Sequence, residues 1–357
     1  MTKTPFHGRL LNQGAALGLA AVLAACGGGA ESGIAGAQQA ARTVPGCSMS
    51  SAPPAASSAP APLNVATMTL LQVLPSDASS CVTTASAEPH YALLDSAAQP
   101  RQQLSVFLPG TGATPSQYPA YLEHGATRGY HVIGLRYPNA ETISALCNDS
   151  GGDAGCTGRA REEIVTGTDL SPLVAVGRAD SIEQRLADAL RYLHTHRPGD
   201  GWGQYLQGDG GVAWDRVLVA GHSQGGGHAA YIGRLHAVQR VGMYSSPSDY
   251  VNSANTYPDW FAMAGAPTSP DRYYGYIHTP DPVANTRRAL QVLDAWGDPS
   301  LFGMAGGVVN VKNNAPPYGN SHRLVTNACG LLALPIQQHN CTMTRGNEPA
   351  WNVVSYP

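Results

Sequence analysis

The segment from Val217 to Gly227 constrains the fold more than any other part of the chain. It reads Val-Leu-Val-Ala-Gly-His-Ser-Gln-Gly-Gly-Gly, so a short apolar run passes directly into a glycine-rich stretch centred on Ser223. A buried strand, a sharp turn with a serine at its apex and a following helix would present the serine hydroxyl at the end of the strand. The glycines have a steric reason, because side chains beside a strained apex would collide with the neighbouring strand and helix. We therefore expect a nucleophile elbow with Ser223 at its apex.

The rest of the chain alternates between strand-like and helix-like segments. Apolar runs predict strands at 104–108, 130–135, 217–220, 241–244, 273–277 and 308–311. Helices are expected at 116–127, 181–194, 225–236 and 283–296. This alternation predicts an α/β fold with a mainly parallel sheet covered by helices on both faces. With 357 residues, of which 43% are hydrophobic, the chain can form one large domain, which we place at residues 63–357.

The charge balance excludes one class of partner. The 21 basic and 24 acidic residues nearly cancel, and neither sign forms a run. A nucleic-acid partner would need a basic face, so we expect none.

The N-terminus has the proportions of an export signal. Basic residues precede an apolar run from Leu10 to Ala25, which is too short to span a bilayer comfortably. Leu23-Ala24-Ala25-Cys26 resembles a bacterial lipobox, which implies cleavage before Cys26 and lipid attachment to its sulfur. Gly27 follows instead of Asp, so the usual inner-membrane retention signal is absent. The alternative is an ordinary signal peptide cut at a small-x-small site, with Cys26 incidental.

These features predict the location and the organisation of the chain. Residues 1–25 would be the signal peptide, and residues 26–62, rich in Ala, Gly, Ser and Pro, a tether that cannot bury enough apolar surface to fold. We expect an exported lipoprotein of the outer membrane or cell surface, whose only membrane contact is the anchor at Cys26. With an ordinary signal peptide it would be periplasmic or secreted.

Six further cysteines indicate disulfides, because their number is even and the chain is expected to be exported. Sequence does not fix the connectivity, and we favour local pairing: Cys147–Cys156, Cys329–Cys341 and Cys47–Cys81. Their spacing does not match a zinc site, and no H-E-x-x-H motif occurs, so no metal site is expected.

With these motifs in place, the chain resembles the α/β-hydrolase fold over residues 90–328. The resemblance rests on the elbow, on the loop Pro109-Gly110-Thr111-Gly112, on Asp281 after a later strand and on His322, which we place after the last strand. The chain also looks like secreted bacterial hydrolases with a G-H-S-Q-G-G-G-H-A-A elbow and a late P-Y-G-x-S-H-R-L segment. One fold supports several chemistries, so it does not settle the substrate.

The resemblance implies a catalytic set in the chain order serine, acid, histidine. Ser223 would be the nucleophile, and His322, in a turn-rich loop, the base that activates it. His222 leads into the elbow and should point away from the serine. His228, on the following helix, is expected to make a packing or polar contact.

Two aspartates compete to orient the histidine. Asp281 follows the strand expected at 273–277 and resembles the acid-bearing turn of the family. Asp249 follows the preceding strand, where some lipases place their acid, and either residue could instead cap its own turn. The backbone N–H groups of Gln224 and Thr111 would form the oxyanion hole.

The expected activity is that of an exported serine hydrolase, of the carboxylesterase or lipase type, that cleaves carboxylic esters through an acyl-enzyme on Ser223. Its substrate would be a small-molecule or polymeric ester, and no cofactor is needed. Two alternatives remain open. One is a non-catalytic cell-surface binding module on the same fold, and the other is an amidase, peptidase or polyester depolymerase with the same triad.

Overall fold

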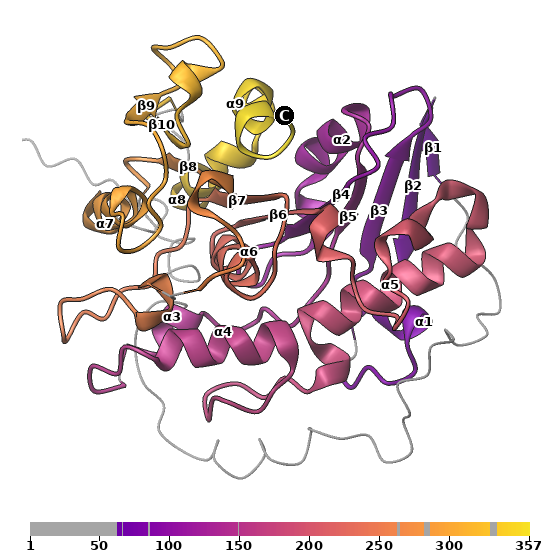
Figure 1. Ribbon diagram of the computed structural model, residues 1–357, viewed down its shortest axis with the longest axis horizontal. Helices are drawn as coiled ribbons and strands as arrows, with labels where there is room; N and C mark the ends of the chain where they lie inside the picture. The colour runs from indigo at the N-terminus through magenta and orange to yellow at the C-terminus, as the bar shows by residue number, and fades with distance from the viewer. Residues whose placement is uncertain are drawn as a thin grey trace, which may run out of the picture. The chain divides into compact units, whose positions relative to one another are not determined.

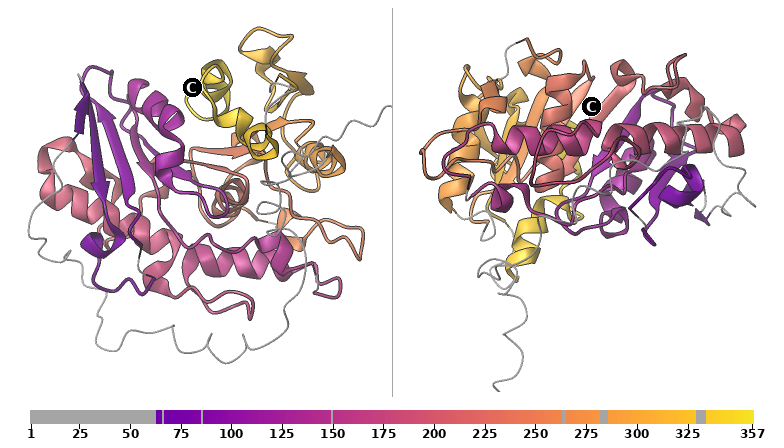
Figure 2. Two further views of the ribbon diagram at one scale, coloured as in Figure 1. Left: turned by 180° about the vertical axis from the view of Figure 1, so that it is seen from behind. Right: turned by 90° about the horizontal axis from the view of Figure 1, so that it is seen from below.

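The computed structural model describes residues 63–65, 67–84, 86–148, 150–262, 265–281, 286–328 and 334–357. The expected signal peptide, the tether and Cys26 lie outside the described residues. In the part of the chain that is described, a single sheet carries helices on both faces, and Figures 1 and 2 show this layering from three sides. No helix there is long and apolar enough to cross a membrane.

The described residues form a ten-stranded sheet in the order β1-β2-β3-β5-β4-β6-β7-β8-β10-β9. The strands are β1 (Leu63–Val65), β2 (Met68–Val73), β3 (His90–Asp95), β4 (Leu104–Leu108), β5 (His131–Gly134), β6 (Val217–His222), β7 (Arg240–Tyr244), β8 (Tyr273–His278), β9 (Val308–Asn310) and β10 (Arg323–Thr326). Strands β1 to β3 pair antiparallel, and β3 pairs antiparallel with β5. All pairs from β5 to β9 are parallel, which confirms the expected mainly parallel sheet.

The α-helices of the described residues lie between the strands and after the last one, with three in succession between β5 and β6. They are α1 (Pro75–Ala78), α2 (Pro119–Thr127), α3 (Ile143–Leu146), α4 (Cys156–Thr166), α5 (Ile182–His196), α6 (Gln224–Leu235), α7 (Thr286–Gly297), α8 (Pro335–His339) and α9 (Glu348–Val354). Helices α2, α5 and α6 lie where the sequence predicts them. Helix α7 matches the segment expected at 283–296 over its described part.

Helix α5 shows why the periodicity of the sequence is a reliable guide. Ile182, Leu186, Leu190 and Leu193 recur at helical spacing, and each is at most 1% exposed. The side chain of Ser181 caps the first turn by accepting a hydrogen bond from the backbone N–H of Gln184, at 3.3 Å.

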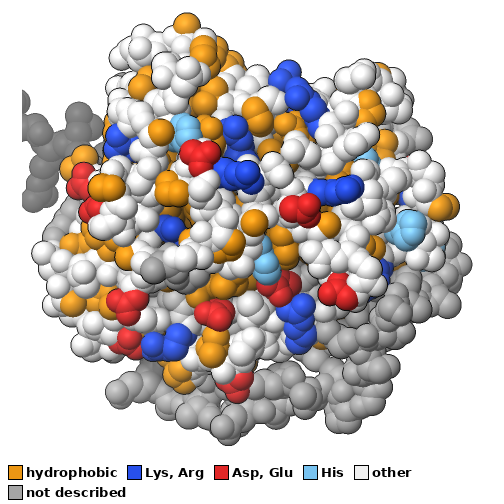
Figure 3. Space-filling model, in the orientation of Figure 1, with side chains coloured by type: hydrophobic (Ala, Val, Ile, Leu, Met, Phe, Trp, Pro, Cys, Tyr) orange, Lys and Arg blue, Asp and Glu red, His pale blue; other side chains and the backbone are white. Residues whose placement is uncertain are grey.

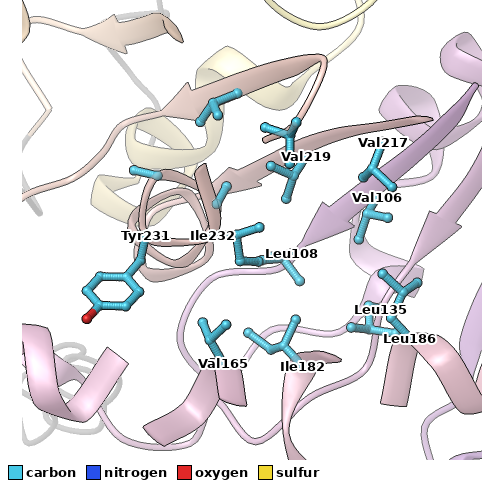
Figure 4. Packing of buried hydrophobic residues seen from close by; sticks show 14 of the residues in the cluster. Val106, Leu108, Leu135, Val165, Ile182, Leu186, Val217, Val219, Tyr231 and Ile232 are labelled. Carbon is cyan, nitrogen blue, oxygen red and sulfur yellow. The ribbon is translucent and has the colours of Figure 1, made fainter. Parts of the chain in front are cut away.

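The core lies on both faces of the central strands, because successive side chains of a strand point to opposite sides. Val106 and Leu108 of β4 and Val217 and Val219 of β6 pack with α4, α5 and α6 (Figure 4). The alternate residues of the same strands, with Phe107 among them, pack on the other face with α2 and α9. The central strands are therefore held from both sides, and the loops at their ends have rigid supports.

One of the three predicted disulfides lies within the described residues. Cys147 and Cys156 are bonded, with their Cα atoms 5.9 Å apart, which confirms that pair. Cys81 and Cys341 are also disulfide-bonded. Their predicted partners, Cys47 and Cys329, lie outside the described residues, so those two pairings stay predictions.

On the face drawn in Figure 3, acidic and basic side chains are interspersed rather than gathered by sign. This agrees with the near-neutral composition.

Candidate active site

The segment around Ser223 has the geometry expected of an elbow. Strand β6 ends at His222, α6 begins at Gln224, and Ser223 between them has φ 54° and ψ −123°. This backbone conformation is unfavourable for a residue with a side chain and persists only where its surroundings fix it. The Ser223 N–H donates to the carbonyl of Tyr244 at 2.8 Å, which ties the turn to β7.

The glycine two residues after the serine is required by a close approach of backbone. A Cβ on Gly225 would lie 2.0 Å from the carbonyl oxygen of Leu108 and 2.5 Å from that of Pro109. The first turn of α6 therefore lies directly against the end of β4. This contact brings the loop after β4 to the serine.

The two residues expected to form the oxyanion hole are in contact. The Thr111 hydroxyl donates to the side-chain oxygen of Gln224 at 3.2 Å, and the N–H of Ile143 donates to the same oxygen at 3.0 Å. Among the described residues, neither the Thr111 nor the Gln224 backbone N–H has a hydrogen-bond acceptor. Both groups are therefore free to bind an oxygen that gains negative charge near Ser223.

His322 lies at the amino ends of the strands, opposite the end at which Ser223 lies. It precedes β10, and its carbonyl accepts the N–H of Gly275, near the amino end of β8. Ser223 follows the carboxyl end of β6, and β6, β7 and β8 are parallel. The two ends of a six-residue strand are about 17 Å apart. The expectation that His322 follows the last strand and lies over the elbow is therefore wrong, since β10 comes after it.

The contacts of His322 explain its position. Its Nδ1 donates to the carbonyl of Tyr273 at 3.1 Å, and its ring stacks on that of Tyr274, with centroids 3.8 Å apart. Burial lowers the pKa of this histidine. These contacts hold the start of β10 against the start of β8.

A different histidine meets the predicted acid. Nδ1 of His339 lies 2.5 Å from Oδ2 of Asp281, and the two side chains are 6% and 0% exposed. His339 ends α8, and its ring centroid is 4.7 Å from that of His222, the residue directly before the serine. The structure thus brings Asp281 and His339 together beside the elbow, and sequence reasoning missed His339.

Asp249 has another partner. Its two carboxylate oxygens accept from Nε and Nη2 of Arg161 at 2.7 and 2.6 Å, and the indole N–H of Trp260 donates to it at 3.1 Å. The Arg161 and Asp249 side chains are 3% and 1% exposed. Arg161 also donates to the carbonyl of Gln224 at 3.2 Å, so this buried pair supports the first turn of α6.

The order of elements now decides the fold. Ser223 follows β6, Asp281 follows β8, and His339 follows β10, the last strand in the chain. The chain order is therefore serine, acid, histidine, and all three follow the carboxyl ends of strands in a mainly parallel sheet. The chain has the α/β-hydrolase fold. Within the described residues, no group of three or more His, Cys, Asp or Glu side chains could hold a metal ion.

No family model and no curated protein matches the chain. Solved structures with a similar arrangement include a cold-adapted esterase from an Arctic intertidal metagenomic library, at 9% identity and a TM-score of 0.42, covering 82% of this chain and 97% of that one. A bacterial heroin esterase has 12% identity and a TM-score of 0.36, covering 82% and 86%. The esterase domain of a Rhodothermus marinus protein has 11% identity and a TM-score of 0.35, covering 81% and 99%. The fold assignment rests on the strand order and the elbow.

Proposed function

We propose that this α/β-hydrolase is a serine hydrolase that cleaves carboxylic esters through an acyl-enzyme on Ser223. The observation that carries the proposal is the contact of Asp281 with Nδ1 of His339, beside a strained serine elbow. Asp281 takes the role expected of it, and His339 replaces His322 as the base.

The geometry supports a division of roles. Because Nδ1 of His339 donates to Asp281, Nε2 carries no proton in the neutral ring and can accept one from the Ser223 hydroxyl. The Ser223 oxygen then bonds to the acyl carbon, and the carbonyl oxygen becomes negatively charged. The N–H groups of Thr111 and Gln224 would bind that oxygen, and losing one such donor typically costs about 3 kcal/mol in activation free energy.

The acyl-enzyme forms when His339 returns the proton to the departing alcohol and the bond to that alcohol breaks. Water then attacks the acyl carbon, with His339 accepting its proton, and the acid leaves as Ser223 recovers its hydrogen. Asp281 holds the imidazole in one tautomer and stabilises its charged form throughout.

A fluorophosphonate probe and a chromogenic short-chain ester test the proposal together. The wild-type protein should be labelled and should hydrolyse the ester, and Ser223→Ala should do neither. Ser116→Ala, which alters an exposed serine of the short 3-10 helix Pro115–Gln117, is the matched control and should behave as the wild type. An unlabelled, inactive wild type would favour a binding module on this fold.

The bond that is cleaved needs a separate comparison. Matched ester and anilide substrates with the same acyl group distinguish an esterase from an amidase or peptidase, because only the leaving group differs. We expect the ester to be cleaved with the higher kcat/KM. A polyester film, compared with its soluble monomeric ester, tests for a depolymerase.

We also propose that the protein is exported and carries a lipid at Cys26. The disulfide-bonded state of Cys147, Cys156, Cys81 and Cys341 supports an oxidising compartment. Metabolic labelling with a fatty acid should mark the wild-type protein in its native host and not Cys26→Ser. Equal labelling of the two, or none in either, would contradict the anchor.

A further inference from the structure

His222 is the residue before the nucleophile, and both nitrogens of its buried ring are engaged. Nδ1 lies 3.1 Å from the hydroxyl of Tyr118, and Nε2 lies 3.1 Å from the backbone carbonyl oxygen of His339. The residue is 1% exposed. The sequence predicts that this side chain points away from the serine, and in the structure its ring joins the segment of Tyr118 to that of His339.

The direction of each hydrogen bond follows from the partners. A carbonyl oxygen only accepts, so Nε2 of His222 must carry the proton. Nδ1 is then the acceptor, and the Tyr118 hydroxyl donates to it. Burial, with a smaller contribution from neighbouring His339, lowers the pKa of His222 to about 3, so the ring stays neutral at ordinary pH.

The contacts continue into the loop after β4, residues 109–112, which carries Thr111 and is called the oxyanion loop below. The N–H of Gly110 donates to the Tyr118 oxygen at 3.3 Å, and Gly110 directly precedes Thr111. A Cβ on Gly110 would be 3.2 Å from the Cβ of Ser223, so this part of the loop lies directly against the nucleophile. One path of hydrogen bonds therefore runs from the oxyanion loop, through Tyr118 and His222, to the backbone of His339.

The carbonyl of His339 has a second donor. The hydroxyl of Ser245 lies 3.4 Å from the same oxygen, so both of its lone pairs are used. Asp281 holds the ring of His339, while His222 and Ser245 hold its backbone. The two sets of contacts together define where the imidazole lies.

We propose that His222 is a positioning residue, which sets the distance of His339 from Ser223 and joins the base to the oxyanion loop through Tyr118. This inference rests on the proposed function, since it assigns His222 a part in that reaction. His222 takes no proton from the substrate or from Ser223. Its contribution is geometric, and a displacement of about 1 Å in such a site can cost about 100-fold in rate.

Two conservative variants separate the two hydrogen bonds of His222, one with the Tyr118 hydroxyl and one with the His339 carbonyl. The side-chain oxygen of His222→Asn can occupy the place of Nδ1 and accept from Tyr118, but no donor reaches the His339 carbonyl. The side-chain amide of His222→Gln can occupy the place of Nε2 and donate to that carbonyl, but no acceptor remains for Tyr118. Tyr118→Phe removes the hydrogen bond between Tyr118 and His222 by deleting its donor.

Activity is measured as kcat per competent site, with sites counted by the fluorophosphonate burst, so that an unfolded fraction does not lower the result. We expect His222→Asn to lose about 10- to 100-fold in kcat with little change in KM, because the base is displaced while substrate binding is kept. His222→Gln should retain more kcat than His222→Asn. Tyr118→Phe should cost less kcat in the His222→Gln background than in the wild type, because the contact between Tyr118 and His222 is already lost and only the Gly110 N–H contact remains to be removed.

The outcomes distinguish this inference from the proposed function. If wild-type Ser223 is neither labelled nor active, the proposed function fails. If the wild type is active and both His222 variants have wild-type kcat per site, or equal losses, the positioning role is overturned. If neither His222 variant accumulates, Ser245→Ala is tested instead, because it removes the other donor to the His339 carbonyl. We expect it to lower kcat at unchanged KM. A wild-type kcat in this variant would overturn the positioning role.

Discussion

The carboxylate of Asp281 lies 2.5 Å from Nδ1 of His339, although the two residues are 58 positions apart. Asp281 follows a central strand, whereas His339 ends a helix of five residues beyond the last strand. The contact places a histidine with one nitrogen committed to an acid beside the residue that precedes the serine. Asp281 thus engages Nδ1 and leaves Nε2 of His339 as the nitrogen that, in the proposed reaction, accepts the Ser223 proton.

The two histidines that follow Asp281 in the C-terminal part of the chain form a matched pair for a test. His339→Ala should lower kcat by at least about 10⁴-fold, because the general base is removed. His322→Ala should retain near-wild-type kcat, since the His322 ring contacts Tyr273 and Tyr274 at the amino ends of the strands, away from Ser223. Steady-state hydrolysis of a chromogenic ester measures both. Loss of activity in the His322 variant, with full activity in the His339 variant, would restore His322 as the base.

The two candidate acids are also expected to differ in what they support. Asp281→Asn should lower kcat by about 10⁴-fold with a small change in stability, because the imidazole loses its orienting and charge-stabilising partner. Asp249→Asn should instead reduce the free energy of unfolding by about 3–5 kcal/mol, because Arg161 is left buried and without its charge partner. Urea unfolding and kcat per titrated site separate these effects. A stable, inactive Asp249 variant would contradict the assignment.

The sequence was sufficient to predict the central part of the fold. Strand 104–108 and the elbow follow from largely apolar runs that stop at Pro109-Gly110 and at Gly221, and α5 follows from apolar residues at helical spacing. These signals are local, and tertiary packing agrees with them. The contact of Thr111 with Gln224 was predictable for the same reason, since both residues lie at carboxyl ends of neighbouring parallel strands.

His339, the proposed base, was missed because one short strand was missed. Strand β10 has four residues, and its central pair, Leu324 and Val325, is buried on both faces, so it shows no alternation. Val308–Asn310 is an edge strand whose first residue is 47% exposed, yet its sequence looks more strand-like. Taking that edge strand as the last one placed His322 after the sheet. Counting Arg323–Thr326 as a strand would have made His339 the histidine of the following loop.

Glycine 225 provides a test of the elbow that does not alter a polar side chain. In Gly225→Ala the new Cβ would lie 2.0 Å from the carbonyl oxygen of Leu108, and backbone there cannot move without shifting β4. We expect a loss of at least about 3 kcal/mol in the free energy of unfolding. The Thr111 loop should move with it, so kcat should fall as well.

Gly199→Ala is the control for that substitution, because a Cβ at Gly199 would meet no atom within 4 Å. Its stability should stay within about 0.5 kcal/mol of wild type. Denaturation in urea, followed by tryptophan fluorescence, measures both variants. Equal stability of the two would show that α6 does not lie against β4 as described.

The stability of the protein should fall as pH falls below about 6.5, because several buried histidines are held neutral. Burial lowers the pKa of His90 and of His222 to about 3, and that of His228 well below its ordinary value. In the unfolded chain each would titrate near 6.5. Between the two pKa values the unfolded state binds more protons, so the free energy of unfolding decreases by up to about 1.4 kcal/mol per pH unit for each such histidine.

His228 is the histidine best suited to test this linkage. Neither of its ring nitrogens has a hydrogen-bond partner among the described residues, and the ring packs edge-on against Tyr137 with centroids 5.4 Å apart. His228→Leu therefore removes a titrating group without removing a hydrogen bond. Between pH 6.5 and 5 its free energy of unfolding should fall less steeply than that of the wild type, by up to about 1.4 kcal/mol per pH unit. Above pH 7.5 the two curves should run parallel, because histidine is neutral in both states there, and equal slopes below pH 6.5 would mean that His228 titrates alike in the folded and unfolded chains.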